Sequence, residues 1–174
     1  MTNWEGIVAE HAGAVWRTAY RLVSNAADAD DCMQEAFTSA VEISRREVVR
    51  SWPALLHRLV TTRSLDRLRR RMREAARRDR PADLAKLPGG EPDPQRQAAG
   101  RELAGQLRHG LARLPAQQAE AFCLRFLSDM SYDEIAGQIG VSSNYVGVIL
   151  HRARLRLRTL LADVAAAENL RCQP

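Results

Sequence analysis

Four polar side chains in the first quarter of the chain are spaced so that they could form one binding surface. They are Asp28, Asp31, Gln34 and Glu35. At 3.6 residues per helical turn, this spacing places all four on one side of a helix. On spacing alone, a solvated face whose acidic residues complement the helix dipole is the simpler interpretation. The chain has a net charge of +5, however, and an acidic surface on a basic protein favours a basic partner that is not DNA.

The opposite side of the same segment is apolar. It carries Met33, Phe37, Ala40 and Val41. We therefore expect the apolar side to pack into a core, while the acidic side remains free to bind.

A dense run of arginines follows between residues 63 and 80, where nine arginines stand against three acidic residues. Guanidinium groups around a helix bind phosphates, and such binding weakens steeply with salt because counterions are released. The predicted phosphate contacts are Arg67, Arg69, Arg70, Arg71 and Arg73. A solubilising helix end is the alternative interpretation. Asp66 is expected to pair with Arg69 or Arg70, three or four residues further on.

Residues 131–154 have the pattern of a DNA-binding helix-turn-helix. Ser131 and Glu134 have capping-box spacing, Gly140 can end the first short helix, and Ser142 can begin the next. The second helix would enter the major groove with its N-terminal end first. Its predicted DNA contacts are Ser142, Ser143, Asn144, Tyr145, His151, Arg152 and Arg154. A generic helical hairpin is the alternative, but the cap, the glycine turn and the basic extension together favour DNA binding.

These side chains require helices to position them. Alanine, leucine and arginine dominate the chain, and alternating β-branched runs are missing, so the sequence predicts an all-α protein. Four prolines and two glycines fall between residues 80 and 96, which is typical of a flexible linker. The predicted organisation is two small helical domains, a three-helix domain at 1–80 and a four-helix domain at 96–174, joined by a linker at 81–95.

Several classes of function are disfavoured by the sequence. There is no GxxxxGK phosphate loop, no metal-binding cluster and no nucleophile–base arrangement. We therefore expect a protein that is not an enzyme and needs no metal or cofactor. Three scattered cysteines, no signal peptide and no apolar stretch of membrane-spanning length predict a cytoplasmic protein without stable membrane insertion.

Five segments in this order resemble the extracytoplasmic-function (ECF) group of the sigma-70 family, which are bacterial transcription initiation factors. The segments are DADDCMQEAF at 28–37, LDRLRR at 65–70, LPAQQ at 114–118, SYDEIA at 131–136 and LHRAR at 150–154. Each segment alone is a weak signal, but five in register on either side of a linker are specific. The resemblance covers residues 4–161.

The resemblance implies a sigma factor that brings core RNA polymerase to a promoter and traps melted −10 DNA. In the family, the acidic surface, and above all the side chains that match Asp31, Gln34 and Glu35, binds the clamp helices of the largest polymerase subunit. The loop that matches residues 42–50 captures an unpaired −10 base, and Trp52 is our candidate for another single-stranded contact. The resemblance also implies that the linker runs near the polymerase active-site channel and that an anti-sigma factor is a further partner.

The resemblance also assigns contacts to double-stranded promoter DNA. The third helix would bind the upstream part of the −10 element, next to the arginine run. The matching positions there are Thr62, Ser64, Asp66, Arg67 and Arg69. The helix-turn-helix would read the −35 element and sit on the polymerase flap.

One position and one segment depart from the family pattern. The family commonly has Asn where Thr62 stands, and Thr-Val-Lys-Ser-Arg-Leu where this chain has Tyr-Val-Gly-Val-Ile-Leu at 145–150. An interior glycine such as Gly147 costs about 1 kcal/mol relative to alanine. The recognition helix therefore either reads DNA through its other residues or contacts a protein, unless Val148 and Ile149 are core residues. Two alternative functions remain open, a free-standing helix-turn-helix regulator and a sigma-like protein-interaction adaptor.

Overall fold

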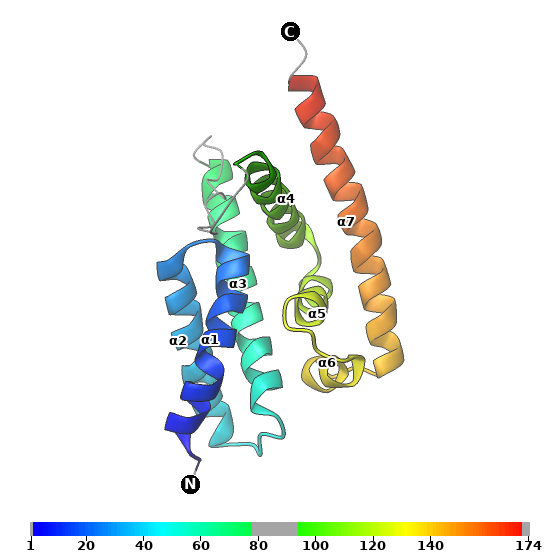
Figure 1. Ribbon diagram of the computed structural model, residues 1–174. Coiled ribbons are helices and arrows are strands. Elements are labelled where there is room, and N and C mark those ends of the chain that lie inside the picture. Colours follow the sequence, from blue (N-terminus) through cyan, green and yellow to red (C-terminus); the bar gives the residue numbers. More distant parts are fainter. Residues whose placement is uncertain (1, 78–93, 172–174) are drawn as a thin grey trace.

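The computed structural model describes residues 2–77 and 94–171, and within these ranges it has seven helices and no strand. The helices are α1 (Trp4–Val23), α2 (Ala26–Ser44), α3 (Trp52–Arg77), α4 (Pro94–Arg113), α5 (Ala116–Phe126), α6 (Tyr132–Ile139) and α7 (Ser143–Arg171) (Figure 1). The all-α prediction is confirmed. Nearly all of the predicted linker at 81–95 lies outside the described residues, so the domain limits stay predictions. Among the described helices, none has both the length and the hydropathy that crossing a bilayer requires.

The first three helices form one domain whose helix ends are fixed by asparagine and serine. The side chain of Asn3 accepts a hydrogen bond from the backbone N–H of Gly6 and caps α1. Ser24 ends α1 in the left-handed conformation, with φ 52°. Asn25 then caps α2 by accepting from the N–H of Asp28 at 3.0 Å. Polar caps of this kind satisfy N–H groups that have no partner inside the helix.

Small and aliphatic side chains fill the core of this domain. The buried residues are Val15, Ala19, Val23, Ala29, Cys32, Ala36, Ala40, Leu55, Leu56 and Val60. Alanine dominates the inner face of α2, which lets α1 and α3 approach it closely. Ser51 precedes α3 and caps it, because Ser51 Oγ accepts from the N–H of Ala54 at 3.4 Å.

The last four helices form the second domain, and its helix-turn-helix has the predicted caps. Ser131 and Glu134 make a complete capping box at the start of α6. Gly140 ends α6 with φ 71°, a left-handed conformation that glycine adopts at no steric cost. The hydroxyl of Ser142 accepts from the N–H of Tyr145 at 3.3 Å and caps α7. The two helices of the motif share one core, in which Ile135, Ala136, Val146 and Leu150 are buried and Ile139 and Val141 pack against them.

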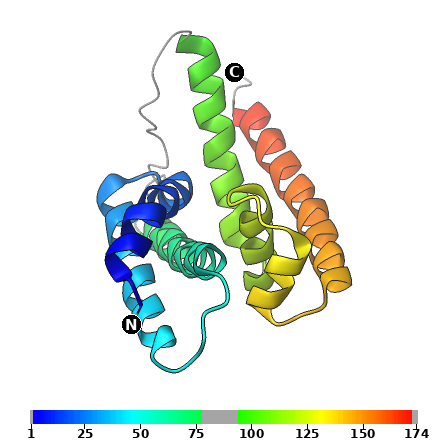
Figure 2. The same cartoon turned by 60° about the horizontal axis from the view of Figure 1, so that its bottom comes forward.

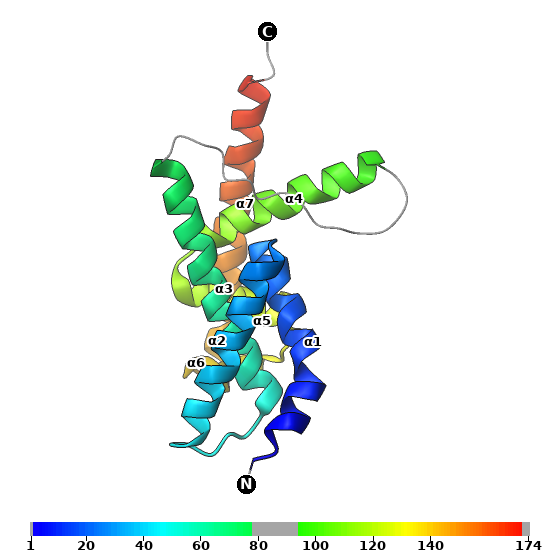
Figure 3. The ribbon, with the colours of Figure 1, turned by 90° about the vertical axis from the view of Figure 1, so that its left-hand side faces the viewer.

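The two domains pack against each other, which the sequence analysis did not foresee. Figures 1 and 2 show α3 between the other helices of its own domain and the four-helix domain. Leu22 and Leu65 join an apolar cluster with Leu111 and Leu114, and Ala54 joins the core of the helix-turn-helix. Figure 3 shows α4 and the C-terminal part of α7 extending beyond the three-helix domain.

Candidate nucleic-acid interface

The acidic surface of α2 faces the arginines of α3. Asp31 and Glu35 remain about half exposed, at 57% and 52% of their side chains, whereas Asp28 is only 21% exposed. Asp28 accepts hydrogen bonds from Arg67 at 2.9 Å and from Arg71 at 3.2 Å. The expectation that the whole acidic side remains free is therefore wrong for Asp28, because its carboxylate is bound within the domain.

Arg67 is the centre of this charge cluster. Its guanidinium lies within 4 Å of three carboxylates, those of Asp28, Asp31 and Glu35, at 2.9, 3.2 and 3.6 Å. Arg63 approaches Glu35 from the same helix at 3.8 Å. Arg67 is predicted to contact DNA, and Asp31 and Glu35 are predicted to contact polymerase. In this arrangement their charges neutralise each other.

Arg69 reaches across to the four-helix domain. Its guanidinium donates to the backbone carbonyls of Ala112 and Leu114, both at 3.3 Å, at the C-terminal end of α4. The predicted pair with Asp66 is confirmed at 3.5 Å. The Arg69 guanidinium, which is predicted to bind a DNA phosphate, thus binds backbone carbonyl oxygens of the other domain in this arrangement.

Thr62 makes a second contact between the domains, together with a residue that the sequence analysis missed. The Thr62 hydroxyl donates to Glu120 of α5 at 3.2 Å, and Arg58 donates to the same oxygen at 3.3 Å. Arg58 stands four residues before Thr62, so a search along the same helix face would have found it.

The other predicted residues of α3 differ in accessibility. Ser64 is fully buried, which contradicts its assignment as a DNA contact in this arrangement. Arg70 is 75% exposed and pairs with Glu74 at 2.9 Å. Arg73 is exposed as well. The end of α3 thus keeps accessible cations, while the preceding turns are engaged with neighbouring helices.

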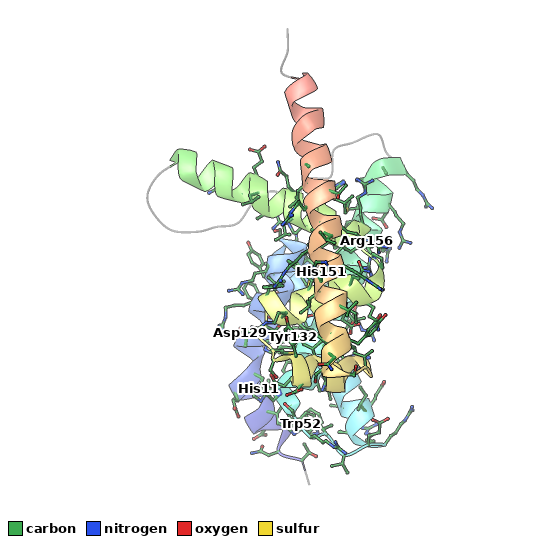
Figure 4. All side chains as sticks on the ribbon, turned by 90° about the vertical axis from the view of Figure 1, so that its right-hand side faces the viewer. His11, Trp52, Asp129, Tyr132, His151 and Arg156 are labelled. Carbon is green, nitrogen blue, oxygen red and sulfur yellow. The ribbon has the colours of Figure 1, made fainter. Side chains whose placement is uncertain are left out.

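Trp52 lies at the end of the three-helix domain, beside the loop between α2 and α3 (Figure 4). Its ring meets the ring of Trp4 edge-on, with centroids 5.0 Å apart. A surface hollow next to this pair is lined by Ile7, Val49 and Trp52 among others. Val48, at the tip of the loop, is 92% exposed. The arrangement offers an aromatic surface and an exposed loop at the place where the sequence predicts capture of an unpaired base.

The start of α7 presents a mixed polar and apolar surface. The Ser143 hydroxyl donates to a carboxylate oxygen of Asp133 on α6, and Asn144 and Tyr145 are exposed. The interpretation that Val148 and Ile149 are core residues is confirmed for Ile149, which is buried. It is wrong for Val148, which is 40% exposed.

Basic residues continue along α7 beyond this start. His151, Arg152 and Arg154 are exposed, and Figure 4 shows His151 on the outer part of the helix. The guanidinium of Arg154 lies over the ring of Phe126, 5.1 Å from its centroid, a cation–π contact that holds it to α5.

Burial perturbs several titratable groups away from these surfaces. It raises the pKa of the Cys32 thiol, and it raises the pKa of Cys123 to about 12. Both thiols are therefore protonated and unreactive at neutral pH. Backbone and side-chain hydrogen bonds from Ser131 lower the pKa of Glu134, which keeps the capping carboxylate ionised. Within the described parts of the chain, no group of three metal-binding side chains comes together.

Comparison with known proteins identifies both domains. The family model for Sigma-70 region 2 matches residues 7–74, and the model for Sigma-70, region 4, matches residues 104–157. The chain is 34% identical over 165 residues to the ECF RNA polymerase sigma factor SigE of Mycolicibacterium smegmatis, covering 93% of this chain and 63% of SigE. It is 33% identical over 156 residues to SigM of Mycobacterium tuberculosis, covering 87% of this chain and 74% of SigM.

The fold is also found among solved structures. The sigma factor RpoE of Bartonella quintana, in complex with the anti-sigma factor NepR, matches with a TM-score of 0.59 at 24% identity, over 93% of this chain and 98% of that one. A region 2 domain followed by a region 4 helix-turn-helix defines a sigma-70 type initiation factor, the class that directs RNA polymerase to promoters. The chain belongs to the ECF RNA polymerase sigma factors.

Proposed function

We propose that this protein directs core RNA polymerase to specific promoters by recognising −10 and −35 elements and trapping melted −10 DNA. The observation that carries the proposal is the match to region 2 and region 4 in one chain and in that order. A free-standing helix-turn-helix regulator is not favoured, because it has no use for a region 2 domain. RNA synthesis itself is the chemistry of the polymerase, so this chain acts as a binding subunit in the cytoplasm.

The half-exposed carboxylates of α2 are the proposed polymerase surface. Asp31 and Glu35 lie on the outer side of α2, and Gln34, the third member, lines the same shallow hollow. Their present partners Arg63 and Arg67 are themselves partly exposed, so ion pairs of this kind exchange at little cost. A basic helix pair of the polymerase can therefore replace them.

Trp52 and the exposed loop are the proposed site for melted −10 DNA. Extruding a base from the duplex costs a few kcal/mol, and stacking of one base on an aromatic ring returns about 1–3 kcal/mol. The paired rings of Trp4 and Trp52 beside Val48 offer such a surface. Thr62, Arg69 and the arginines that follow would hold the adjoining duplex.

The helix-turn-helix is the proposed reader of the −35 element. Asn144 and Tyr145 stand at the exposed start of α7, which is the end that enters a major groove. Arg152 and Arg154 follow about two to three turns later and are suited to phosphates. The exposed apolar side chain of Val148 lies between these two sets, where it can contact a thymine methyl group.

In vitro transcription with core polymerase tests the proposal. The purified chain is added to core enzyme with a genomic library as template, and start sites are mapped. We expect a set of transcripts that share −10 and −35 sequences and depend on the chain. Asp31→Lys and Glu35→Lys, tested singly and together, should weaken and then abolish core binding. Glu10→Lys, at an exposed position of α1, makes the same change in charge as either single substitution and is the matched control. Absence of any promoter-specific transcript would favour the protein-interaction adaptor.

An anti-sigma factor is the proposed regulatory partner. The B. quintana RpoE, which has the same fold, was captured with its anti-sigma factor NepR. Co-purification of this chain from its native cell, followed by identification of the bound protein, tests whether it too has such a partner.

A further inference from the structure

We propose that, in the free protein, the four-helix domain occupies the α3 surface that promoter DNA would bind, with Glu120 and the end of α4 in place of DNA phosphates. The inference rests on the proposed function, because α3 is the proposed −10 helix. It adds that the four-helix domain of the same chain competes with DNA for α3. Binding of DNA to α3 then requires the two domains to separate.

Glu120 is the first part of this contact. One carboxylate oxygen of Glu120 accepts from both Arg58 and Thr62 on α3, at 3.3 and 3.2 Å. A phosphate oxygen accepts hydrogen bonds from arginine and hydroxyl groups in the same way. The Glu120 side chain is only 19% exposed, so a duplex cannot reach these donors while α5 stays in place.

The C-terminal end of α4 is the second part. The last carbonyls of a helix have no partner within it, and they form the negative end of the helix dipole. Arg69 donates to two carbonyls there, those of Ala112 and Leu114. The Arg69 guanidinium, which is proposed to bind a DNA phosphate, thus has its hydrogen bonds met by neutral carbonyl groups at the negative end of the helix dipole.

The loop that precedes α3 is covered in a similar manner by α6. A hollow between the domains is lined by Arg50 and Arg58 on one side and by Asp133 and Glu134 on the other. Acidic side chains of the helix-turn-helix therefore face basic side chains beside the predicted site of base capture. Acidic or negatively polarised groups of the second domain thus lie opposite basic residues at three places, which are this hollow, Glu120 and the end of α4 beside Arg69.

Apolar contacts complete the interface. Leu22 and Leu65 of the three-helix domain pack with Leu111 and Leu114, and the two leucines of the first domain are almost fully buried. Such a patch stabilises the closed arrangement, while its polar bonds are of a type that DNA can replace. An interface that combines few apolar residues with exchangeable ion pairs is suited to opening when polymerase and promoter bind.

Distance measurement between spin labels tests the closed arrangement. The labels are placed by Glu10→Cys on α1 and Arg158→Cys on α7, both exposed positions, in a full-length chain that also carries Cys172→Ser. Cys32 and Cys123 are buried and do not take label. We expect one short-distance population, and Glu120→Arg should add a longer one because it places two guanidinium groups together. Glu102→Arg, exposed on α4, is the control with the same change in charge.

Binding to a fluorescent random-sequence DNA duplex is the second readout. Opening of the domains by Glu120→Arg should tighten binding by about threefold or more relative to Glu102→Arg, since only the competent fraction binds. Combining Glu120→Arg with Arg58→Glu restores the ion pair in reverse and should restore the short distance. Such a rescue shows that the charge clash at this contact, and not misfolding, separates the domains in the single variant.

Unchanged distances in Glu120→Arg, or equal duplex affinities of the two arginine variants, would overturn the inference. The proposed function is judged separately, by transcription with wild-type chain and core polymerase. Normal transcription with unchanged distances removes only the inferred competition between Glu120 and DNA for α3. Absence of promoter-specific transcripts removes the proposed function, whatever the label distances show.

Discussion

Arg67 donates to Asp28 at 2.9 Å and thereby ties the middle of α3 to the first turn of α2. The second oxygen of the same carboxylate accepts from Arg71, which also donates to the backbone carbonyl of Val23 at 2.9 Å. Asp28 is thus held between two arginines that the sequence predicts as DNA contacts. Asp28 therefore joins α2 to α3, although it shares a helix face with Asp31 and Glu35, which stay accessible.

Substitution of Asp28 should therefore destabilise the fold more than substitution of Asp31. Asp28→Asn removes the carboxylate that Arg67 and Arg71, both partly buried, share, and we expect a loss of about 1–2 kcal/mol in the free energy of unfolding. Asp31→Asn removes a mostly exposed ion pair, for which less than about 1 kcal/mol is expected. Urea unfolding followed by circular dichroism measures both. Equal losses in the two variants would contradict a joining role for Asp28.

Much of this fold was predictable from local sequence. Caps such as Ser131 and Ser142 act on N–H groups within three residues, so their spacing alone predicts them, and the structure confirms both. The apolar core of the helix-turn-helix follows helical periodicity in the same way. Local patterns of this kind need no knowledge of distant segments.

The contacts between domains were not predictable in the same way. Glu120 and Thr62 are separated by 58 residues, and nothing in the spacing of either helix relates them. The burial of Ser64 was missed because the family resemblance assigned this position to the DNA contacts, whereas in this chain Ser64 lies on the side of α3 that packs against Cys32 of α2. The accessible acidic surface was overestimated because the arginines that bind Asp28 come from another helix, α3.

Salt dependence should identify the arginines that contact phosphates. Arg73 is exposed at the end of α3, and each phosphate contact contributes about 0.9 to the slope of log affinity against log salt. Arg73→Gln should therefore lower the slope by about 1 for holoenzyme binding to a promoter duplex. Arg17→Gln on exposed α1 provides the control with the same charge change. An unchanged slope for Arg73→Gln would remove it from the DNA surface.

Stability should decrease as the pH falls through the ordinary range of histidine. Burial, and then the charge of His11, lower the pKa of His57 in the folded chain, and its Nδ1 lies 3.3 Å from the Thr18 hydroxyl. The folded state therefore favours the neutral ring. This contribution is fully present above the unfolded pKa of about 6.5 and is lost as protons bind below it.

Thermal unfolding between neutral and mildly acidic pH measures the effect of His57. His57→Gln keeps a polar side chain that does not titrate, so its stability should vary less with pH than that of the wild type. Burial also lowers the pKa of His109, so a smaller dependence remains in the variant. The same pH profile in both proteins would show that His57 does not contribute.

Two glycines of the helix-turn-helix should respond in opposite directions to alanine. A Cβ added at Gly147 would lie 3.6 Å from the Tyr132 ring, an ordinary contact, within a regular stretch of α7. Gly147→Ala should therefore stabilise the protein by about 0.5–1 kcal/mol. Gly140 has φ 71°, so Gly140→Ala should destabilise it by about 1 kcal/mol or more. Urea unfolding of both variants, with promoter binding measured alongside, checks this. If Gly147→Ala is more stable but binds the −35 element less well, the glycine serves close approach to DNA and not the fold.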